Sequence, residues 1–127
     1  MGGKILIQGS IIRATYGIVA LLFPKLLLAA AQMSEPELGD EARYFNRLFG
    51  GRDLLVAIAT VAAVKNGAAS QAAKANVFCE ATDTISLLEE ARSRGKLDRT
   101  LAIGLAFNIA GYLTWLRALR ALWRSAT

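Results

Sequence analysis

The chain contains no histidine and a single cysteine, Cys79. Without histidine, a haem axial imidazole, a carboxylate-histidine di-iron site and the Ser-His-Asp and Cys-His nucleophile pairs are excluded. The lone cysteine cannot close an internal disulfide, and no CxxC motif or Cys/His cluster is present to bind zinc or an iron–sulfur centre. Because Cys79 lies in an apolar stretch, we expect a buried, inert thiol. We expect no metal site and no cofactor.

Proline is also scarce, with Pro24 and Pro36 the only two. Alanine and leucine recur throughout, so the backbone is free to form long helices, and strands are not expected. Phosphate-binding glycine loops are absent, because Gly50 and Gly51 belong to neither a GxxxxGKS/T nor a GxGxxG pattern. Nothing marks a nucleophile or a substrate pocket, so we do not expect an enzyme.

Apolar residues make up 54% of the 127 residues, charged residues 20%, and the net charge is +5. This is richer in apolar side chains than an ordinary soluble domain, and the length suits one domain. The basic residues are spread along the chain, which argues against nucleic-acid binding. The exception is a basic tail beside Trp115 and Trp123, a pattern with which membrane helices end at the headgroup layer. The tail comprises Arg117, Arg120 and Arg124.

The hydrophobic pattern predicts four helices, over about residues 4–32, 40–65, 71–93 and 97–124. The segment Ile5–Phe23 is 19 residues long with one charge, Arg13, and Thr100–Leu116 has no charge over 17 residues. At the helical rise, the first segment spans about 28 Å, close to the thickness of a hydrocarbon core. It continues past a plausible cleavage point, so we expect a retained helix and not a signal peptide.

The breaks between these helices follow from turn-forming residues. Pro24 marks a kink or an end in the first helix, and Ser34–Glu41 is predicted to be a loop. The second helix is then expected to begin near Asp40, with acids in its first turn. Lys65–Gly67 ends it, and Gly95 separates the third helix from the fourth.

Four apolar helices with short connections predict an all-α, up-down transmembrane bundle with both termini on one side. The first and last segments are apolar nearly all round, as in helices that face lipid. The alternative is a soluble four-helix bundle, which the charges in the second and third helices favour. We expect a multi-pass cell-membrane protein, in contact with the lipid bilayer and part of a homo-oligomer or a larger membrane protein complex.

The positive-inside rule does not decide the orientation, because bases are nearly equal in number on the two sides. The side with the termini has Lys4, Lys65, Lys74, Arg117, Arg120 and Arg124. The opposite side has Lys25, Arg43, Arg47, Arg92, Arg94, Lys96 and Arg99. Only the compact basic tail favours cytoplasmic termini.

Each predicted helix has one face of small or polar residues at spacings of three and four, which should turn toward a common interior. Polar residues expected inside the bundle are Tyr16, Asn76, Asn108 and Tyr112. Glycines expected to permit close helix packing are Gly9, Gly17, Gly50, Gly51, Gly104 and Gly111. Thr60, Thr84 and Trp115 also fall on these faces.

Five charged residues are predicted at membrane depth: Arg13, Arg52, Asp53, Glu80 and Asp83. Uncompensated charge in a low-dielectric interior is costly, so these groups should pair or lose their charge. Arg52 and Asp53 are adjacent and point about 100° apart, so they need not pair with each other. With two bases and three acids, one carboxyl is in excess, and Glu80 or Asp83 is expected to carry the proton.

The segment Arg43–Thr60, RYFNRLFGGRDLLVAIAT, resembles the arginine-aspartate signature of small four-helix bacterial membrane proteins of undescribed function. The acid-containing third helix around Asp83 fits their layout, whereas Ala57 replaces the glycine with which they tend to continue the signature. The resemblance covers about half of the chain. It supports the topology and implies no activity.

Two functional classes follow for a membrane protein of this kind. The first is a non-catalytic accessory or interaction subunit of a membrane assembly, indicated by small size and glycine-bearing faces. The second is a small oligomeric proton- or cation-coupled transporter or channel, because intramembrane ionisable residues often mark ion pathways. In the first class the charges only tie the helices together.

Overall fold

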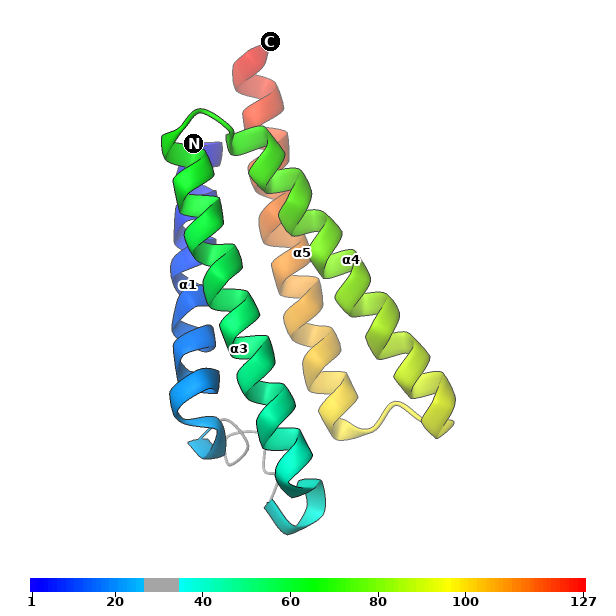
Figure 1. The fold of residues 1–127 in the computed structure, drawn as a ribbon. Coiled ribbons are helices and arrows are strands. Elements are labelled where there is room, and N and C mark those ends of the chain that lie inside the picture. The colour runs from blue at the N-terminus through cyan, green and yellow to red at the C-terminus, as the bar shows by residue number, and fades with distance from the viewer. Residues whose placement is uncertain (27–34) are drawn as a thin grey trace.

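The computed structural model describes residues 1–26 and 35–127, and their side chains except those of residues 35–42. Within these ranges four long helices occur: α1 (Gly2–Leu22), α3 (Glu35–Lys65), α4 (Ala69–Arg94) and α5 (Arg99–Ala126). The same ranges contain no strand, so the all-α prediction is confirmed. Figure 1 shows both chain ends and the α3–α4 turn at one end of the molecule, and the α4–α5 connection at the other.

Helix α1 ends earlier than predicted. It stops at Leu22, and Phe23 leaves the helical conformation with φ −131° and ψ 57°. Proline disfavours the helical conformation in the residue before it and cannot donate a backbone hydrogen bond, so Pro24 breaks the helix at Phe23, and residues 24–26 are helical again. Residues 27–32 of the predicted first helix lie outside the described residues.

Helix α3 begins earlier than predicted. It starts at Glu35, so the prediction that the segment up to Glu41 is a loop was wrong. Pro36 occupies the first turn, where the backbone N–H has no partner within the helix and proline is well tolerated. The acidic residues of the segment suit the positive end of the helix dipole.

The two remaining connections are short and lie where the glycines predicted them. Gly67 and Gly95 adopt the left-handed conformation, with φ 78° and 69°. Gly95 ends α4. Asp98 then caps α5, because its side chain accepts a 3.0 Å hydrogen bond from the backbone N–H of Leu101. The first orphan donors of α5 are thereby partly satisfied.

Glycines allow α1 and α3 to pack backbone against backbone. A Cβ on Gly17 would lie 2.7 Å from the carbonyl oxygen of Gly50, and a Cβ on Gly50 would lie 2.6 Å from that of Gly17. About two turns earlier on α1, a Cβ on Gly9 would lie 2.6 Å from the Trp115 ring of α5. A larger residue at Gly17 or Gly50 would force the helices apart, and one at Gly9 would displace the Trp115 ring.

The buried side chains of this bundle are mostly small or polar. The core contains Leu6, Ala20, Ala57, Ala72, Ala73, Leu101, Trp115 and Ala118, with Ser10, Thr60, Asn76 and Glu80 buried among them. Large apolar side chains instead face outward from every long helix described, including Ile12, Leu55, Phe78 and Phe107, which are 72%, 67%, 70% and 73% exposed. Soluble domains rarely expose so many large apolar side chains.

Two of the described helices, α1 and α5, are long and apolar enough to cross a membrane. The fold therefore suggests membrane association, through one helix at each end of the sequence.

Candidate functional site: a buried network of ion pairs

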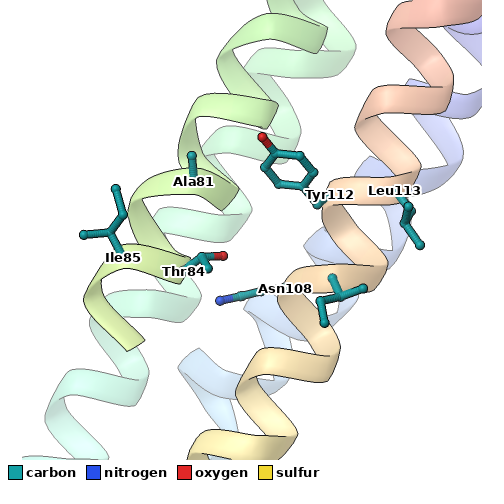
Figure 2. Close-up of a pocket in the computed structure, with 7 residues that line it drawn as sticks. Ala81, Thr84, Ile85, Asn108, Tyr112 and Leu113 are labelled. Atoms are coloured by element: carbon teal, nitrogen blue, oxygen red, sulfur yellow. The ribbon is translucent and has the colours of Figure 1, made fainter. Parts of the chain in front are cut away.

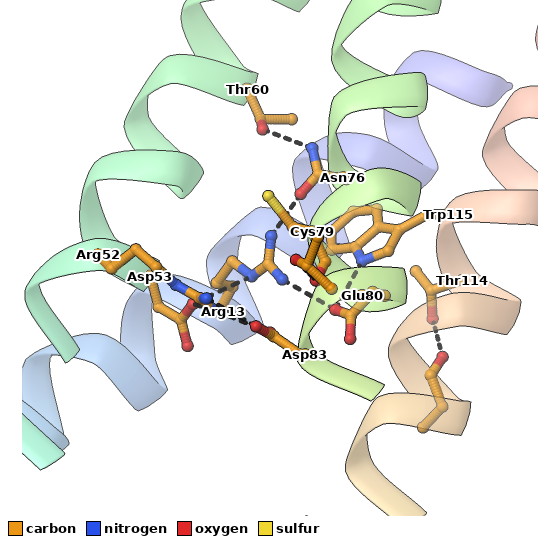
Figure 3. A network of polar contacts seen from close by, with 12 residues as sticks. Arg13, Arg52, Asp53, Thr60, Asn76, Cys79, Glu80, Asp83, Thr114 and Trp115 are labelled. Atoms are coloured by element: carbon orange, nitrogen blue, oxygen red, sulfur yellow. Dashed lines mark hydrogen bonds and ion pairs between the residues drawn. The ribbon is translucent and has the colours of Figure 1, made fainter. Parts of the chain in front are cut away.

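Arg13 of α1 lies at the centre of a network of polar contacts between helices (Figure 3). Its side chain is only 9% exposed. One guanidinium nitrogen donates to Oε1 of Glu80 at 2.8 Å, and the other donates to Oδ1 of Asn76. Its Nε lies 3.7 Å from Oδ1 of Asp53. A single arginine thus joins α1 to both α3 and α4.

Glu80 extends the network to α5. The same Oε1 accepts a 3.1 Å hydrogen bond from the indole nitrogen of Trp115, and the guanidinium of Arg13 lies 5.3 Å from the centre of a Trp115 ring. Gly111 makes room for the carboxylate, because a Cβ there would lie 2.6 Å from Oε1. With 8% of its side chain exposed, Glu80 is held by charge, hydrogen bond and close packing together.

A second, more open pair joins α3 to α4. Arg52 contacts Asp83 through both guanidinium nitrogens, at 2.7 and 2.8 Å, which is the bidentate geometry of strong arginine–carboxylate pairs. Arg52 also lies 3.1 Å from Oδ1 of Asp53, so these neighbours pair although their positions point apart. The long arginine side chain spans that angle. Asp53 therefore lies between both arginines and connects the two pairs.

Asn76 is nearly inaccessible, with 1% exposed. Its Oδ1 accepts the hydrogen bond from Arg13, and its amide nitrogen donates to the Thr60 hydroxyl at 2.8 Å and to the carbonyl of Ala72 at 2.9 Å. We did not predict the parts played by Thr60 and Trp115, although both lie on the polar faces that the spacing identified. Buried Ser10 was missed entirely, and nothing in the sequence pattern distinguishes it.

The other predicted residues are placed differently. Tyr16 is 40% exposed and not inside the bundle, because Gly17 makes the contact with α3 and the preceding position is turned about 100° away. Gly51 has open space beside it, and Gly104 faces the side chain of Leu87. Cys79 is half-buried, whereas the sequence predicted a buried thiol.

Asn108 and Tyr112 line a groove between α4 and α5 and lie outside the charge network (Figure 2). The groove has a volume of about 380 Å³ and is open on its outer side. Thr84, Ala81, Ile85, Ile109 and Leu113 complete its wall. Neither Asn108 nor Tyr112 makes a side-chain hydrogen bond in the part of the chain that the structure describes.

Chemically, the five charged side chains form an arrangement suited to holding helices together. Each has an opposite charge within 4 Å, and the formal sum of two arginines and three carboxylates is −1. That one of these carboxyls carries a proton remains a prediction. Among the described residues, no group of three or more histidine, cysteine, aspartate or glutamate side chains could hold a metal ion.

The fold and the site together define an all-α protein whose helices are joined by a central ion-pair network. Compared with protein-family models, curated proteins and solved structures, the chain matches none. The resemblance of Arg43–Thr60 to small bacterial membrane proteins therefore stays a prediction.

Proposed function

We propose that the chain is an integral membrane protein whose four long helices cross the bilayer as one up-down bundle. The large apolar side chains face outward and the polar ones inward, which is the arrangement expected when the solvent is hydrocarbon. Arg13 is nine residues from Lys4 and nine from Leu22, where α1 ends, or about 14 Å along the helix in each direction. The network then lies near the middle of a hydrocarbon core about 30 Å thick.

Within that bundle, we propose that the charges are structural and that the protein is a non-catalytic interaction subunit of a membrane assembly. The ion pairs of Arg13 with Asp53 and Glu80 connect α1, α3 and α4, and the hydrogen bond from Trp115 to Glu80 adds α5. Removing one partner of a buried pair leaves an uncompensated charge, so these ion pairs should strongly affect the stability of the helix packing.

The surface that supports an interaction role is the groove between α4 and α5. In hydrocarbon, an asparagine amide without a hydrogen-bond partner is costly, and transmembrane helices associate through such side chains. The groove combines this polar group with apolar walls, Ile85, Ile109 and Leu113. Its proposed occupant is a transmembrane helix of another protein that presents a hydrogen-bonding side chain to Asn108.

The glycines, in contrast, do not support an outside partner. The helix faces that contain Gly9, Gly17 and Gly50 suggested association with a partner helix. All three glycines instead make contacts between helices of this chain. The Glu80 carboxylate likewise fills the space beside Gly111. The groove, and not a glycine face, is therefore the surface to test.

Membrane integration is the first outcome to measure. We expect the expressed protein to stay in the membrane pellet after washing with sodium carbonate and to be released only by detergent, because all four long helices expose large apolar side chains. Quantitative immunoblotting of the fractions measures this. Recovery as a monodisperse protein without detergent would favour the soluble bundle instead.

Purification from native membranes in a mild detergent tests the interaction role. We expect stoichiometric partner subunits with the wild-type protein. With Asn108→Leu, which removes the hydrogen-bonding group, we expect at least about a tenfold loss of these subunits, equivalent to about 1.4 kcal/mol of binding free energy. Phe107→Leu, at the exposed neighbouring position outside the groove, should retain the partners.

The same purification separates the second candidate function. A homo-oligomer without foreign subunits would favour a small proton- or cation-coupled transporter or channel, since four helices rarely enclose a pathway alone. Among the described residues, neither the groove between α4 and α5 nor a smaller groove between α1 and α3 is lined by Arg13, Asp53, Glu80 or Asp83. The smaller groove is lined by Ser10, Ile11, Ala14, Ala57, Ile58 and Val61. We therefore place the interaction subunit first.

A further inference from the structure

The charges outside the central network are divided unevenly between the two ends of the bundle. The end with both termini and the α3–α4 turn, called the basic end here, carries Lys4, Lys65, Lys74, Arg117, Arg120 and Arg124. No aspartate or glutamate occurs among residues 1–34, 54–79 or 99–127, the segments that contain these six. All six side chains are exposed, and none has an ion-pair partner among the described residues.

The opposite end is balanced. It contains seven acidic and seven basic residues, counted from the sequence of the helix ends that meet there. Several of these pair with each other along α4. Arg94 lies 2.8 Å from Glu90 and 2.6 Å from Asp98, and Arg92 contacts Glu89. The net charge of the chain is therefore concentrated at the basic end.

Half of the cations of the basic end belong to the last turns of α5. Arg117, Arg120 and Arg124 are three and seven residues apart, so they share one face of α5. The last turns of α5 extend beyond the α3–α4 turn (Figure 1). Trp123, between two of the arginines in sequence, is 62% exposed, which suits the boundary between hydrocarbon and headgroups.

We propose that the basic end binds the headgroups of anionic phospholipids in the adjacent leaflet. The inference rests on the proposed membrane insertion and adds the class of ligand. Charge complementarity supports it, because the unpaired cations lie where the apolar surface of the bundle ends. Exposed Leu113 and Leu116 directly precede the arginine face on α5, so the cations are held at headgroup depth.

Native mass spectrometry of the full-length protein with equal amounts of phosphatidylglycerol and phosphatidylcholine tests this proposal. We expect at least about fivefold more phosphatidylglycerol bound at low salt, since one cation near an anionic surface contributes roughly that factor. The preference should fall toward one as salt is raised, because exposed charges are screened. Equal binding of the two lipids by the wild-type protein would overturn the proposal.

Charge-matched variants locate the site. The triple variant Arg117→Gln, Arg120→Gln, Arg124→Gln should lose most of the preference, and the pair Lys65→Gln, Lys74→Gln should lower it through other helices. The control triple Arg47→Gln, Lys96→Gln, Arg99→Gln removes the same charge from the opposite end and should stay within about twofold of wild type. Equal losses from both triples would contradict a site at the basic end.

The carbonate wash separates a failure of the headgroup site from a failure of the membrane bundle. If the protein and both triples stay in the membrane pellet while no lipid preference is found, only the headgroup site is wrong. If the wild-type protein is not in the pellet, the proposed membrane bundle itself is wrong. Circular dichroism of each variant, compared with wild type, identifies any that has lost its helices.

Discussion

Replacing Glu80 with leucine should lower the free energy of unfolding by about 3–5 kcal/mol. The substitution leaves the guanidinium of Arg13 buried, with Asn76 and the more distant Asp53 as its remaining partners. It also removes the acceptor of the Trp115 indole N–H. Unfolding in detergent micelles by titration with a denaturing detergent, followed by circular dichroism, measures the change.

Two comparisons make this result specific. Glu90→Leu removes an exposed carboxylate of the same helix, whose ion pair with Arg94 is a surface pair and contributes little. The double variant Arg13→Met, Glu80→Leu should recover most of the stability, because an apolar pair can replace a buried ion pair with little net cost. If Glu80→Leu is as stable as Glu90→Leu, the network does not hold the bundle together.

The second large effect is expected at the crossing of α1 and α3. Gly50→Ala would place a Cβ 2.6 Å from the carbonyl oxygen of Gly17 and 2.8 Å from the Cβ of Ala20. Because the nearest atom belongs to a helix backbone, the two helices must separate. Forcing extra volume into a packed interior costs about 1–3 kcal/mol, and the same unfolding titration reports it.

The neighbouring glycine provides the control. A Cβ on Gly51 would have no atom within 4 Å, so Gly51→Ala should be neutral or stabilising by up to about 1 kcal/mol, the difference in helix propensity. Opposite signs for two alanine substitutions at adjacent positions would identify the close crossing. A stabilised Gly50→Ala variant would show that α1 and α3 do not pack in this way.

Particular residues show how far sequence reasoning reached. The spacing of Arg13, Asp53, Glu80 and Asp83 placed them on helix faces that meet, and the structure brings them within 4 Å of an opposite charge. The same spacing failed for Tyr16, since a helical face is wider than the strip that a neighbouring helix covers. It also could not place Asn108 and Tyr112, because a polar face can turn toward the core or toward a groove.

The helix ends divide in the same way. Gly67 and Gly95 could be assigned from sequence, since their left-handed conformation is a local property of glycine. Pro36 was misassigned, because a proline ends a helix or begins one according to which neighbouring residues are helical. Local sequence does not contain that information.

The scarcity of cysteine and proline and the absence of histidine, with the long apolar segments, determined by themselves that this is a helical protein without an internal disulfide or histidine chemistry. The sequence also indicated which charges need partners. A charged residue on an inward-turned helix face, among apolar neighbours, is costly to bury without an opposite charge. Only the tertiary structure decided the pairing, including the connection of both arginines through Asp53 and of Glu80 to Trp115. The reason is geometric. Which side chains on different helices can pair depends on how closely the helices approach, and Gly17, Gly50 and Gly111 permit the close approach because they have no Cβ.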